Sequence, residues 1–308
     1  MLFLGNNKHV YFHWTVQEEE STLLRSFLNK KGISKRLLAK VKYQGGHLLV
    51  NDEEVTVRKQ LALKDEVTVV FPVEKDNERL TPSYKDIDIL FEDDHYLIVN
   101  KPAGVAAVPS PTHREDTMAN RVKGYALNTQ SMQSMIHVVT RLDRETSGAM
   151  IFAKHSFAHA QLDLQLRSKE LKKYYLAILE GRMELNKHGL IEEPIARSES
   201  SIITRKVHPS GKESLTEYWV RNVTNDHTVV EVQLHTGRTH QIRVHFSHLG
   251  FPLLGDDLYG GSLSIEMDRQ ALHCAKLSFE HPFMDKQITV KAPLPMDLEK
   301  WLGIRIAE

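Results

Sequence analysis

The chain has 308 residues, of which 41% are hydrophobic and 26% are charged, a composition typical of a globular protein and not of a disordered or fibrous one. Its 40 basic and 40 acidic side chains cancel, so the net charge identifies no partner, and any attraction to nucleic acid must come from how the charges are distributed. No segment approaches the ~18 apolar residues of a membrane span, so we expect no membrane partner.

The single cysteine, Cys274, excludes an internal disulfide framework and is typical of a protein from a reducing compartment. It lies in an apolar run, 271–275, which favours a buried, inert thiol over a nucleophile. The first residues are too polar for a secretory leader, because Asn6, Asn7 and Lys8 precede any long apolar run. We therefore expect the protein to be cytoplasmic.

The N-terminal segment has the signals of two short helices after a strand. A strand-like run covers 10–16, and apolar residues at helical spacing then cover 23–28. Gly32 is well placed to end this helix, and Ser34 to cap a second helix. The pair Gly45-Gly46 would end the second helix.

Two further strands, 47–50 and 67–71, complete this segment. The polar residues that follow contain a proline and few apolar side chains, which indicates a linker. The sequence thus predicts a first domain at 1–74, a linker at 75–85 and a larger domain at 86–308.

The charge of the chain is least even between residues 21 and 51, where there is no acidic residue. This stretch holds seven basic residues: Arg25, Lys30, Lys31, Lys35, Arg36, Lys40 and Lys42. Because packing needs only one face of each helix, these side chains are free to line the other face and meet phosphates. An ordinary solvated helix surface is the alternative.

The order of elements favours the first interpretation. A helix, the sequence Gly-Ile-Ser-Lys-Arg, a second helix, Gly-Gly and then Leu49-Val50-Asn51 resemble the S4 RNA-binding domain over about residues 12–73. The resemblance implies that these seven basic residues bind RNA.

From residue 86 onward, strand-like runs dominate, with helical stretches near 156–168 and 239–249. The strand-like runs are 87–91, 96–99, 149–153, 174–179, 228–234 and 287–290. Strands that mix irregularly with few helices predict an α+β fold.

The segment 138–150 combines an apolar strand, a loop with Arg141, Asp143 and neighbouring charges, and Gly148 before a second apolar strand. Loops between strands of a rigid scaffold often carry catalytic groups. Taken alone, Asp143 is more often a turn carboxylate than a nucleophile.

Several sequence blocks, in this order along the chain, change that interpretation. They are Asn100-Lys101-Pro102-Ala103-Gly104, Arg141-Leu142-Asp143 with Thr146-Ser147-Gly148, Lys173-Tyr174-Tyr175-Leu176-Ala177 before Gly181, 237–245, Gly255-Asp256, Tyr259-Gly260, 271–273, Leu277 and 279–282. Together they resemble the RluA/RluD-type RNA pseudouridine synthases over about residues 86–295. The resemblance implies a catalytic domain built on a mixed, largely antiparallel β-sheet with flanking helices.

The resemblance also implies roles for individual residues. Asp143 matches the essential aspartate of the family, Tyr175 its active-site tyrosine and Arg243 its active-site basic residue. Arg238 and His240 fall near the expected rim of the site, where they could face phosphate, and so could His245.

The implied reaction breaks the N1–C1′ bond of uridine, rotates the base and joins C5 to C1′, so no cofactor and no metal is expected. A carboxylate can attack at C1′ or at C6 and leave again. Arginine suits the role of its partner, because it keeps its charge and favours the ionised carboxylate where water is excluded.

One position departs from the family pattern. The residue before Arg141 is commonly histidine in the family, and here it is Thr140. Any role that depends on an imidazole at this position is therefore in doubt, whereas the nucleophile is unaffected. Arg141 is expected to be structural or to contact phosphate.

Other interpretations explain less. His235, His240, His245 and His248 could suggest zinc, but they lack the HExxH spacing and have no nearby cysteine. A hydrolase using Asp143 and Glu145 would explain none of the other blocks. Neither a GxxxxGK nor a GxGxxG loop is present, so we expect no nucleotide cofactor.

The main rival is an RNA-binding protein that uses the same scaffold without catalysis, for instance in ribosome assembly. The combination of Asp143, Tyr175 and Arg243 argues against it. The resemblance makes large-subunit ribosomal RNA the expected substrate, with tRNA as the alternative. We expect a monomer, since RNA is the partner and no exposed apolar repeat stands out.

Overall fold

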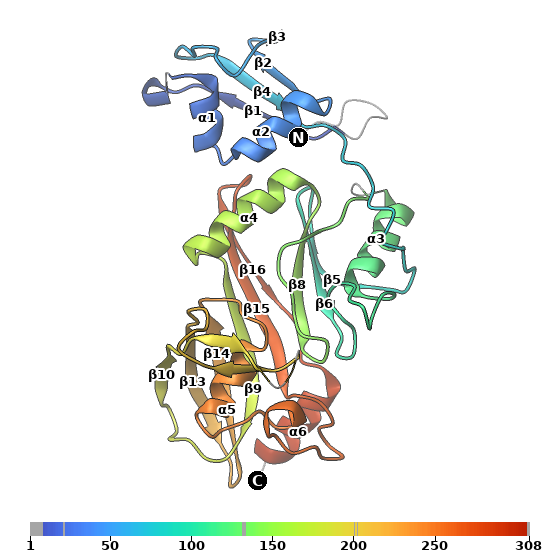
Figure 1. Ribbon diagram of the computed structural model, residues 1–308, viewed down its shortest axis with the longest axis vertical. Coiled ribbons are helices and arrows are strands. Elements are labelled where there is room, and N and C mark those ends of the chain that lie inside the picture. Colours follow the sequence, from blue (N-terminus) through green and yellow to red (C-terminus); the bar gives the residue numbers. More distant parts are fainter. Residues whose placement is uncertain (1–8, 21, 131–133, 200, 202, 307–308) are drawn as a thin grey trace.

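The computed structural model describes residues 9–306, except 21, 131–133, 200 and 202 (Figure 1). The expectation about a leader concerns residues 1–8 and lies outside the described residues. Within the described part of the chain, no helix combines the length and the apolar composition that a membrane span requires.

Helices and short 3-10 turns are spread along the whole described chain. They are η1 (Glu18–Glu20), α1 (Leu24–Lys30), α2 (Lys35–Tyr43), α3 (Met118–Thr129), α4 (Ser156–Ser168), α5 (Gln241–His248), η2 (Asp257–Tyr259) and α6 (Met296–Ile306). The predicted helices near 23–28, 37–41, 156–168 and 239–249 are confirmed. The sequence patterns did not indicate α3 or α6.

The N-terminal unit, residues 9–71, has its own sheet and core. Its antiparallel sheet has the order β1 (Tyr11–Thr15), β4 (Glu66–Val70), β2 (His47–Val50) and β3 (Glu53–Glu54). The predicted cap is present, because the Ser34 hydroxyl accepts a hydrogen bond from the backbone N–H of Leu37 at 3.2 Å. Gly46 is required after α2, since a Cβ there would lie 2.5 Å from the carbonyl oxygen of Val70.

A large mixed sheet forms the rest of the molecule. Its main path is β10 (His188–Ile191), β13 (Thr216–Val223), β14 (His227–Leu234), β9 (Lys172–Glu180), β15 (Leu272–His281), β8 (Ser147–Ala153), β6 (Tyr96–Lys101) and β5 (Asp88–Glu92). β7 (His137–Val138) pairs with β8 and β16 (Lys286–Lys291) with β15, while β11 (Ile195–Arg197) and β12 (Arg205–Val207) form a separate ribbon. The β15–β8 pair is parallel, and the other pairs are antiparallel. This mixed, largely antiparallel α+β architecture confirms the predicted fold class; β13 and β15 were not foreseen as strands.

The two faces of β9 meet different partners. Tyr175, Ala177 and Leu179 belong to the main core, whereas Ile178 packs with Leu298 and Trp301 of α6 in a separate cluster. This alternation follows from the two-residue period of a strand.

An aromatic cluster joins the N-terminal unit to α4. Phe157 lies at the start of α4. The centroid of its ring is 4.7 Å from the ring centroid of Phe12, 5.2 Å from that of Phe71 and 5.5 Å from that of Phe283. Phe157 is 1% exposed and belongs to the core of the N-terminal unit. The side-chain amide of Gln161, one turn further along α4, donates to the carbonyl of Lys31 at 2.8 Å. The two parts therefore share a core.

We expect Phe157→Ala to lower the free energy of unfolding by about 3–5 kcal/mol, because it leaves a cavity in this shared core. Urea denaturation measures the change, and limited proteolysis around residues 75–85 should become faster. Leu164→Ala on the same helix is the control, since Leu164 is 47% exposed. Equal stability of the two variants would contradict the role of the aromatic cluster.

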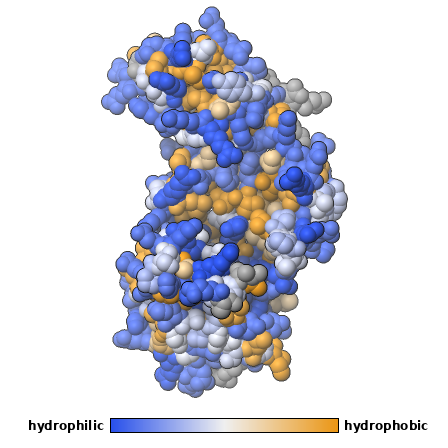
Figure 2. All heavy atoms as spheres, in the orientation of Figure 1, coloured by the Kyte–Doolittle hydropathy of each residue, from blue (hydrophilic) through white to orange (hydrophobic). Residues whose placement is uncertain are grey.

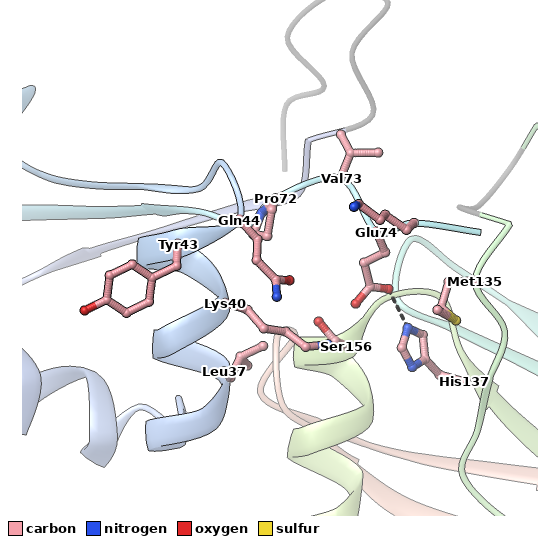
Figure 3. Close-up of a pocket in the computed structure, with 11 residues that line it drawn as sticks. Leu37, Lys40, Tyr43, Gln44, Pro72, Val73, Glu74, Met135, His137 and Ser156 are labelled. Atoms are coloured by element: carbon pink, nitrogen blue, oxygen red, sulfur yellow. Dashed lines mark hydrogen bonds and ion pairs between the residues drawn. The ribbon is translucent and has the colours of Figure 1, made fainter. Parts of the chain in front are cut away.

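A cleft of about 430 Å³ runs beside this joint. Lys40 of α2, Glu74 and His137 are among its lining residues, and the Glu74 carboxylate pairs with the His137 ring across it (Figure 3). Figure 2 shows that the molecule narrows where the N-terminal unit meets α4, and that apolar side chains gather below this narrowing. Lys75, the first residue of the segment predicted as a linker, also lines this cleft.

Candidate active site

Asp143 lies on the loop between β7 and β8, and its side chain is 25% exposed. The backbone N–H of Thr146 donates to its carbonyl at 3.1 Å, which makes the loop a tight turn. At the end of the loop, Gly148 has a φ of +110°, and a Cβ there would lie 2.3 Å from the carbonyl oxygen of Cys274. Only glycine allows β15 to approach so closely, so Gly148 fixes where the loop ends.

Two buried cations hold the backbone of this loop. The amine of Lys101, fully buried on β6, donates to the carbonyls of Pro102, Val105 and Arg144 at 2.7–2.8 Å. Burial lowers the pKa of Lys101 to about 7, although Glu145 and Asp143 oppose the change. Lys101 lay in a block quoted for the family resemblance but was not predicted as a site residue.

The second cation is Arg269, which the sequence did not single out. Its guanidinium donates to the carbonyl of Glu145 at 2.9 Å and pairs with Asp297 at the start of α6 at 2.7 Å. The loop that carries Asp143 is therefore connected to β6 on one side and to α6 on the other.

Arg243 reaches Asp143 from the first turn of α5. Its Nη1 atom lies 3.5 Å from Asp143 Oδ2, and its side chain is 7% exposed. Its Nε and Nη2 atoms bind both oxygens of Asp256 at 2.7 Å, and the Asp256 side chain is fully buried. Burial disfavours the charge of Arg243, but Asp256 and then Asp143 outweigh it and raise its pKa. Asp256, which sequence reasoning left without a role, is thus the firmer partner of Arg243.

We expect Arg243→Lys to reduce the single-turnover rate by about 100-fold without abolishing it. A lysine keeps the charge but lacks the planar fork, so it cannot hold Asp256 with two hydrogen bonds and still approach Asp143. Arg221→Lys is the matched control, because Arg221 binds Glu231 of the neighbouring strand in an exposed ion pair. A rate for Arg243→Lys equal to that of the control would show that Asp143 does not depend on Arg243.

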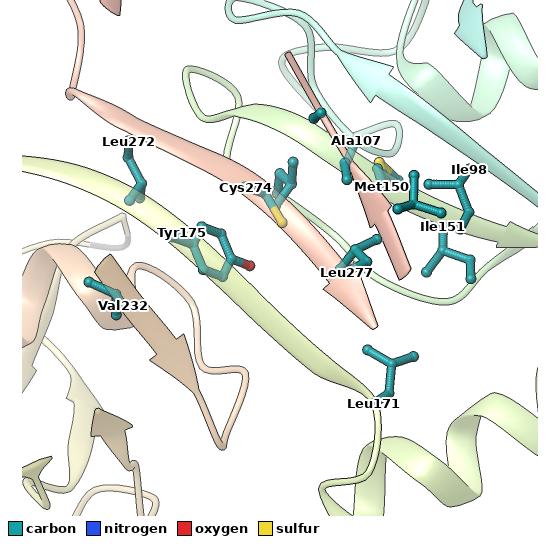
Figure 4. Close-up of a cluster of buried hydrophobic side chains, with 14 of the residues drawn as sticks. Ile98, Ala107, Met150, Ile151, Leu171, Tyr175, Val232, Leu272, Cys274 and Leu277 are labelled. Carbon is teal, nitrogen blue, oxygen red and sulfur yellow. The ribbon is translucent and has the colours of Figure 1, made fainter. Parts of the chain in front are cut away.

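Tyr175 lies on β9 between β14 and β15, 5% exposed (Figure 4). Burial, together with nearby Cys274 and Asp143, raises its pKa well above its ordinary value, so the phenol keeps its proton. Cys274 is buried as predicted, and burial raises the pKa of its thiol to about 12. An inert thiol therefore lies against the tyrosine.

The remaining predicted site residues are Arg141, Arg238 and His240, and Thr140 is the residue that departs from the family pattern. Arg141 and Arg238 are exposed, and Arg238 Nε donates to the carbonyl of Glu213 at 3.0 Å. His240 caps α5 and hydrogen-bonds to the hydroxyl of Tyr259 at 2.8 Å. Thr140 is buried, and its hydroxyl accepts from the backbone N–H of Ile151 at 3.1 Å, so it completes the edge of β8.

The expectation that His245 could face phosphate is wrong. Its ring is fully buried and hydrogen-bonds to the Thr216 hydroxyl at 2.8 Å and to the carbonyl of Glu193 at 2.9 Å. His245 belongs to the packing of α5, and its direction follows from being two residues after Arg243 on the helix. His235 pairs separately with Glu217 at 2.7 Å.

The basic residues of the N-terminal unit differ in accessibility. Lys31 pairs with Glu20 at 2.7 Å, and Lys40 lines the cleft beside α4. The exposed ones are Arg25, Lys30, Lys35, Arg36 and Lys42. In Figure 1 their helices lie beyond α4, and β8 leads from the Asp143 loop toward α4. The basic helices and Asp143 are therefore well separated.

The fold and the site together define an α+β protein whose candidate centre is a carboxylate held beside a buried arginine. A family model described as RNA pseudouridylate synthase matches residues 95–248, which include Asp143, Tyr175 and Arg243. The chain belongs to the RNA pseudouridylate synthase family and is a pseudouridine synthase, an isomerase.

Relatives and solved structures agree with this assignment. The chain is 43% identical to an RNA pseudouridine synthase, YjbO of Bacillus subtilis (strain 168), over 90% of this chain and 97% of the relative. It is 34% identical to ribosomal large subunit pseudouridine synthase D of Buchnera aphidicola subsp. Acyrthosiphon pisum (strain APS), over 83% and 85%. The structure of human RNA pseudouridylate synthase domain containing 1 superposes with a TM-score of 0.55 at 25% identity, covering 69% of this chain and 85% of that one.

Proposed function

We propose that the protein converts specific uridines of large-subunit ribosomal RNA to pseudouridine, with Asp143 as the nucleophile. The observation that carries the proposal is the contact between Asp143 and Arg243 at 3.5 Å. Lys101 and Arg269 hold the loop that carries Asp143 through its backbone carbonyls. Asp256 holds the guanidinium of Arg243. Such fixed supports are what a site needs to keep reacting groups in one geometry.

In this proposal the ionised carboxylate of Asp143 attacks the nucleoside at C1′ or at C6, and the N1–C1′ bond breaks. The base rotates within the site, C5 joins C1′ and the carboxylate leaves. The proton at C5 is then lost and N1 takes up a proton, so the product is an isomer of uridine. Arg243 stabilises the ionised carboxylate where the bound base excludes water. Asp256 binds the Nε and Nη2 atoms of Arg243, and the Nη1 atom faces Asp143.

Tyr175 would form a wall of the pocket for the base. Its burial keeps the ring in one orientation, and its protonated phenol can donate but cannot act as a strong base. The uridine must leave its stack to reach this depth, which costs a few kcal/mol. We assign Arg141, Arg238 and His240 to contacts with the RNA around the flipped nucleotide.

We assign the N-terminal unit to an S4-type RNA-binding domain covering residues 1–74, followed by a linker at 75–85 and the catalytic domain at 86–308. Two short helices on a small antiparallel sheet, with exposed cations on those helices, support this assignment. The protein would act as a monomer in the cytoplasm, and light scattering with and without RNA tests the monomer.

The names of relatives support ribosomal RNA as the target. Two relatives, from Buchnera aphidicola and Vibrio cholerae, are ribosomal large subunit pseudouridine synthases D at 34% and 32% identity. A tRNA substrate is the alternative, since the chemistry of the site is the same.

Mapping of pseudouridines in total RNA from cells with and without the gene tests the proposal. The expected result is the loss of one or a few sites in large-subunit ribosomal RNA; loss only in tRNA would support the alternative. The purified protein should also release tritium from RNA labelled at C5 of uridine. No lost site together with no tritium release would favour a non-catalytic RNA-binding protein on the same scaffold.

A further inference from the structure

Tyr259, to which the proposed mechanism gives no role, lies between Arg243 and His240. It ends η2, three residues after Asp256. Its ring faces the guanidinium of Arg243, whose Cζ is 4.9 Å from the ring centroid, and the ring of His240 meets it edge-on at 5.6 Å. One aromatic ring therefore contacts both the partner of Asp143 and the residue that caps α5.

The hydroxyl of Tyr259 has two hydrogen-bond partners, and their chemistry favours one direction of donation. The backbone N–H of Arg205 donates to its hydroxyl oxygen at 2.9 Å, and the same oxygen lies 2.8 Å from His240 Nδ1. Because a backbone N–H can only donate, it uses a lone pair of the phenol and leaves the phenolic proton for Nδ1. A neutral histidine that accepts at Nδ1 carries its own proton at Nε2.

The surroundings favour these protonation states near neutral pH. Burial raises the pKa of Tyr259, so the phenol remains a donor. Burial also lowers the pKa of His240; Asp143 opposes this change, and Arg243 and Arg205 add to it. His240 is therefore a neutral donor, and Arg205 and Arg243 beside it can help to hold an anion.

The Nε2 atom of His240 is available to a ligand. No residue in the described part of the chain hydrogen-bonds to it, and His240 is only partly buried. The direction of the ring follows from the hydrogen bond between Nδ1 and the Tyr259 hydroxyl and from the edge-on contact of the two rings. Arg243 follows one turn later on the same helix.

We propose that Tyr259 is a positioning residue that holds His240 as the Nε2–H tautomer, so that His240 donates to a phosphate oxygen next to the target uridine. The proposal rests on the proposed function for its substrate, but the tautomer can be measured without RNA. A neutral donor orients the nucleotide without displacing a counterion, so it adds rate and not salt-dependent affinity.

The tautomer is read by ¹⁵N NMR of the full-length protein near neutral pH, with the His240 signals assigned by their loss in His240→Gln. Wild type should show His240 protonated at Nε2, and Tyr259→Phe should show a mixture of tautomers. Tyr125→Phe is the control, since the Tyr125 hydroxyl donates to Glu92 at 2.6 Å, away from this group. Protonation at Nδ1 in wild type, or an unchanged tautomer in Tyr259→Phe, would overturn the proposal.

The second measurement is single-turnover conversion of a transcribed large-subunit RNA fragment. Tyr259→Phe keeps the ring against Arg243, and we expect it to be about tenfold slower, because His240 would no longer be held to donate its hydrogen bond to the charged phosphate. The salt dependence of its RNA affinity should be unchanged. His240→Gln keeps an N–H near the position of Nε2 and should retain more rate than His240→Leu.

Equal rates for His240→Gln and His240→Leu, or a wild-type rate for Tyr259→Phe, would overturn the donor role. A flatter salt dependence in His240→Leu would also overturn it, because it would show that His240 binds as a cation. Failure of wild type to form pseudouridine in this RNA would instead contradict the proposed target, and the NMR result would still stand.

Discussion

Asp143→Asn should reduce pseudouridine formation by a factor of about 10⁴ or more, because an amide keeps the shape of the side chain but not its nucleophilicity. The fold should be nearly unaffected. Asp143 makes one loose contact with Arg243, and Arg243 keeps its two hydrogen bonds to the buried Asp256. The measurements are tritium release under single-turnover conditions and urea denaturation, with RNA affinity measured in parallel.

Two further variants complete this test, one at the same position and one as a control. Asp143→Ala guards against slow conversion of the asparagine back to aspartate. Asp163→Asn is the control, since Asp163 pairs with Arg167 on the surface of α4. Multiple turnover by both Asp143 variants on an RNA that wild type modifies would show that another group is the nucleophile.

Replacing the exposed cations of the N-terminal unit by glutamine should weaken RNA binding strongly at low salt. The variant carries Arg25→Gln, Lys30→Gln, Lys35→Gln, Arg36→Gln and Lys42→Gln. Each lost phosphate contact should flatten the plot of log affinity against log salt by ~0.7–0.9, so three contacts would lower the slope by roughly two to three units. A salt titration on one RNA measures the change.

Substitution is a better test here than deletion of residues 1–74. The core of the N-terminal unit includes Phe157, so deletion would expose apolar surface on α4. The matched control replaces exposed lysines outside the unit: Lys169, Lys187, Lys286, Lys291 and Lys300. Equal slopes for the two variants would mean that the basic helices are only solvated. An unchanged single-turnover rate at saturating RNA would separate recognition from chemistry.

Local signals in the sequence were sufficient for the N-terminal unit. The helical spacing of apolar residues, the Ser34 cap and the Gly45-Gly46 stop depend on neighbours along the chain, and the structure has each of them. Helix α3 has no such pattern, because its buried face includes Asn120 and Lys123. Lys123 is held by Asp76 at 2.8 Å, a partner that no local pattern reveals.

The candidate site was predicted through resemblance and not through spacing. Asp143 and Arg243 lie 3.5 Å apart, and Asp143 is near enough to Tyr175 to help raise its pKa. Their supports could not be predicted in the same way. Asp256 binds Arg243 across a bend in the chain, and Arg269 reaches Glu145 from a position 124 residues away in sequence. Such contacts are set by the order of strands in the sheet, which no stretch of sequence encodes alone.

The shared core between the N-terminal unit and α4 fixes the distance between the basic helices and Asp143. Strand β8 is about 20 Å long, and the diameter of α4 adds about 10 Å. The basic helices therefore lie on the order of 30 Å from Asp143. That length is comparable with one turn of a nucleic-acid duplex, ~34 Å in B-form DNA. An RNA that engages both ends must place folded backbone at that distance from its target uridine. Shape at a distance, and not only the sequence around the uridine, would then select the site, and a hairpin trimmed to the target loop would lose that selection.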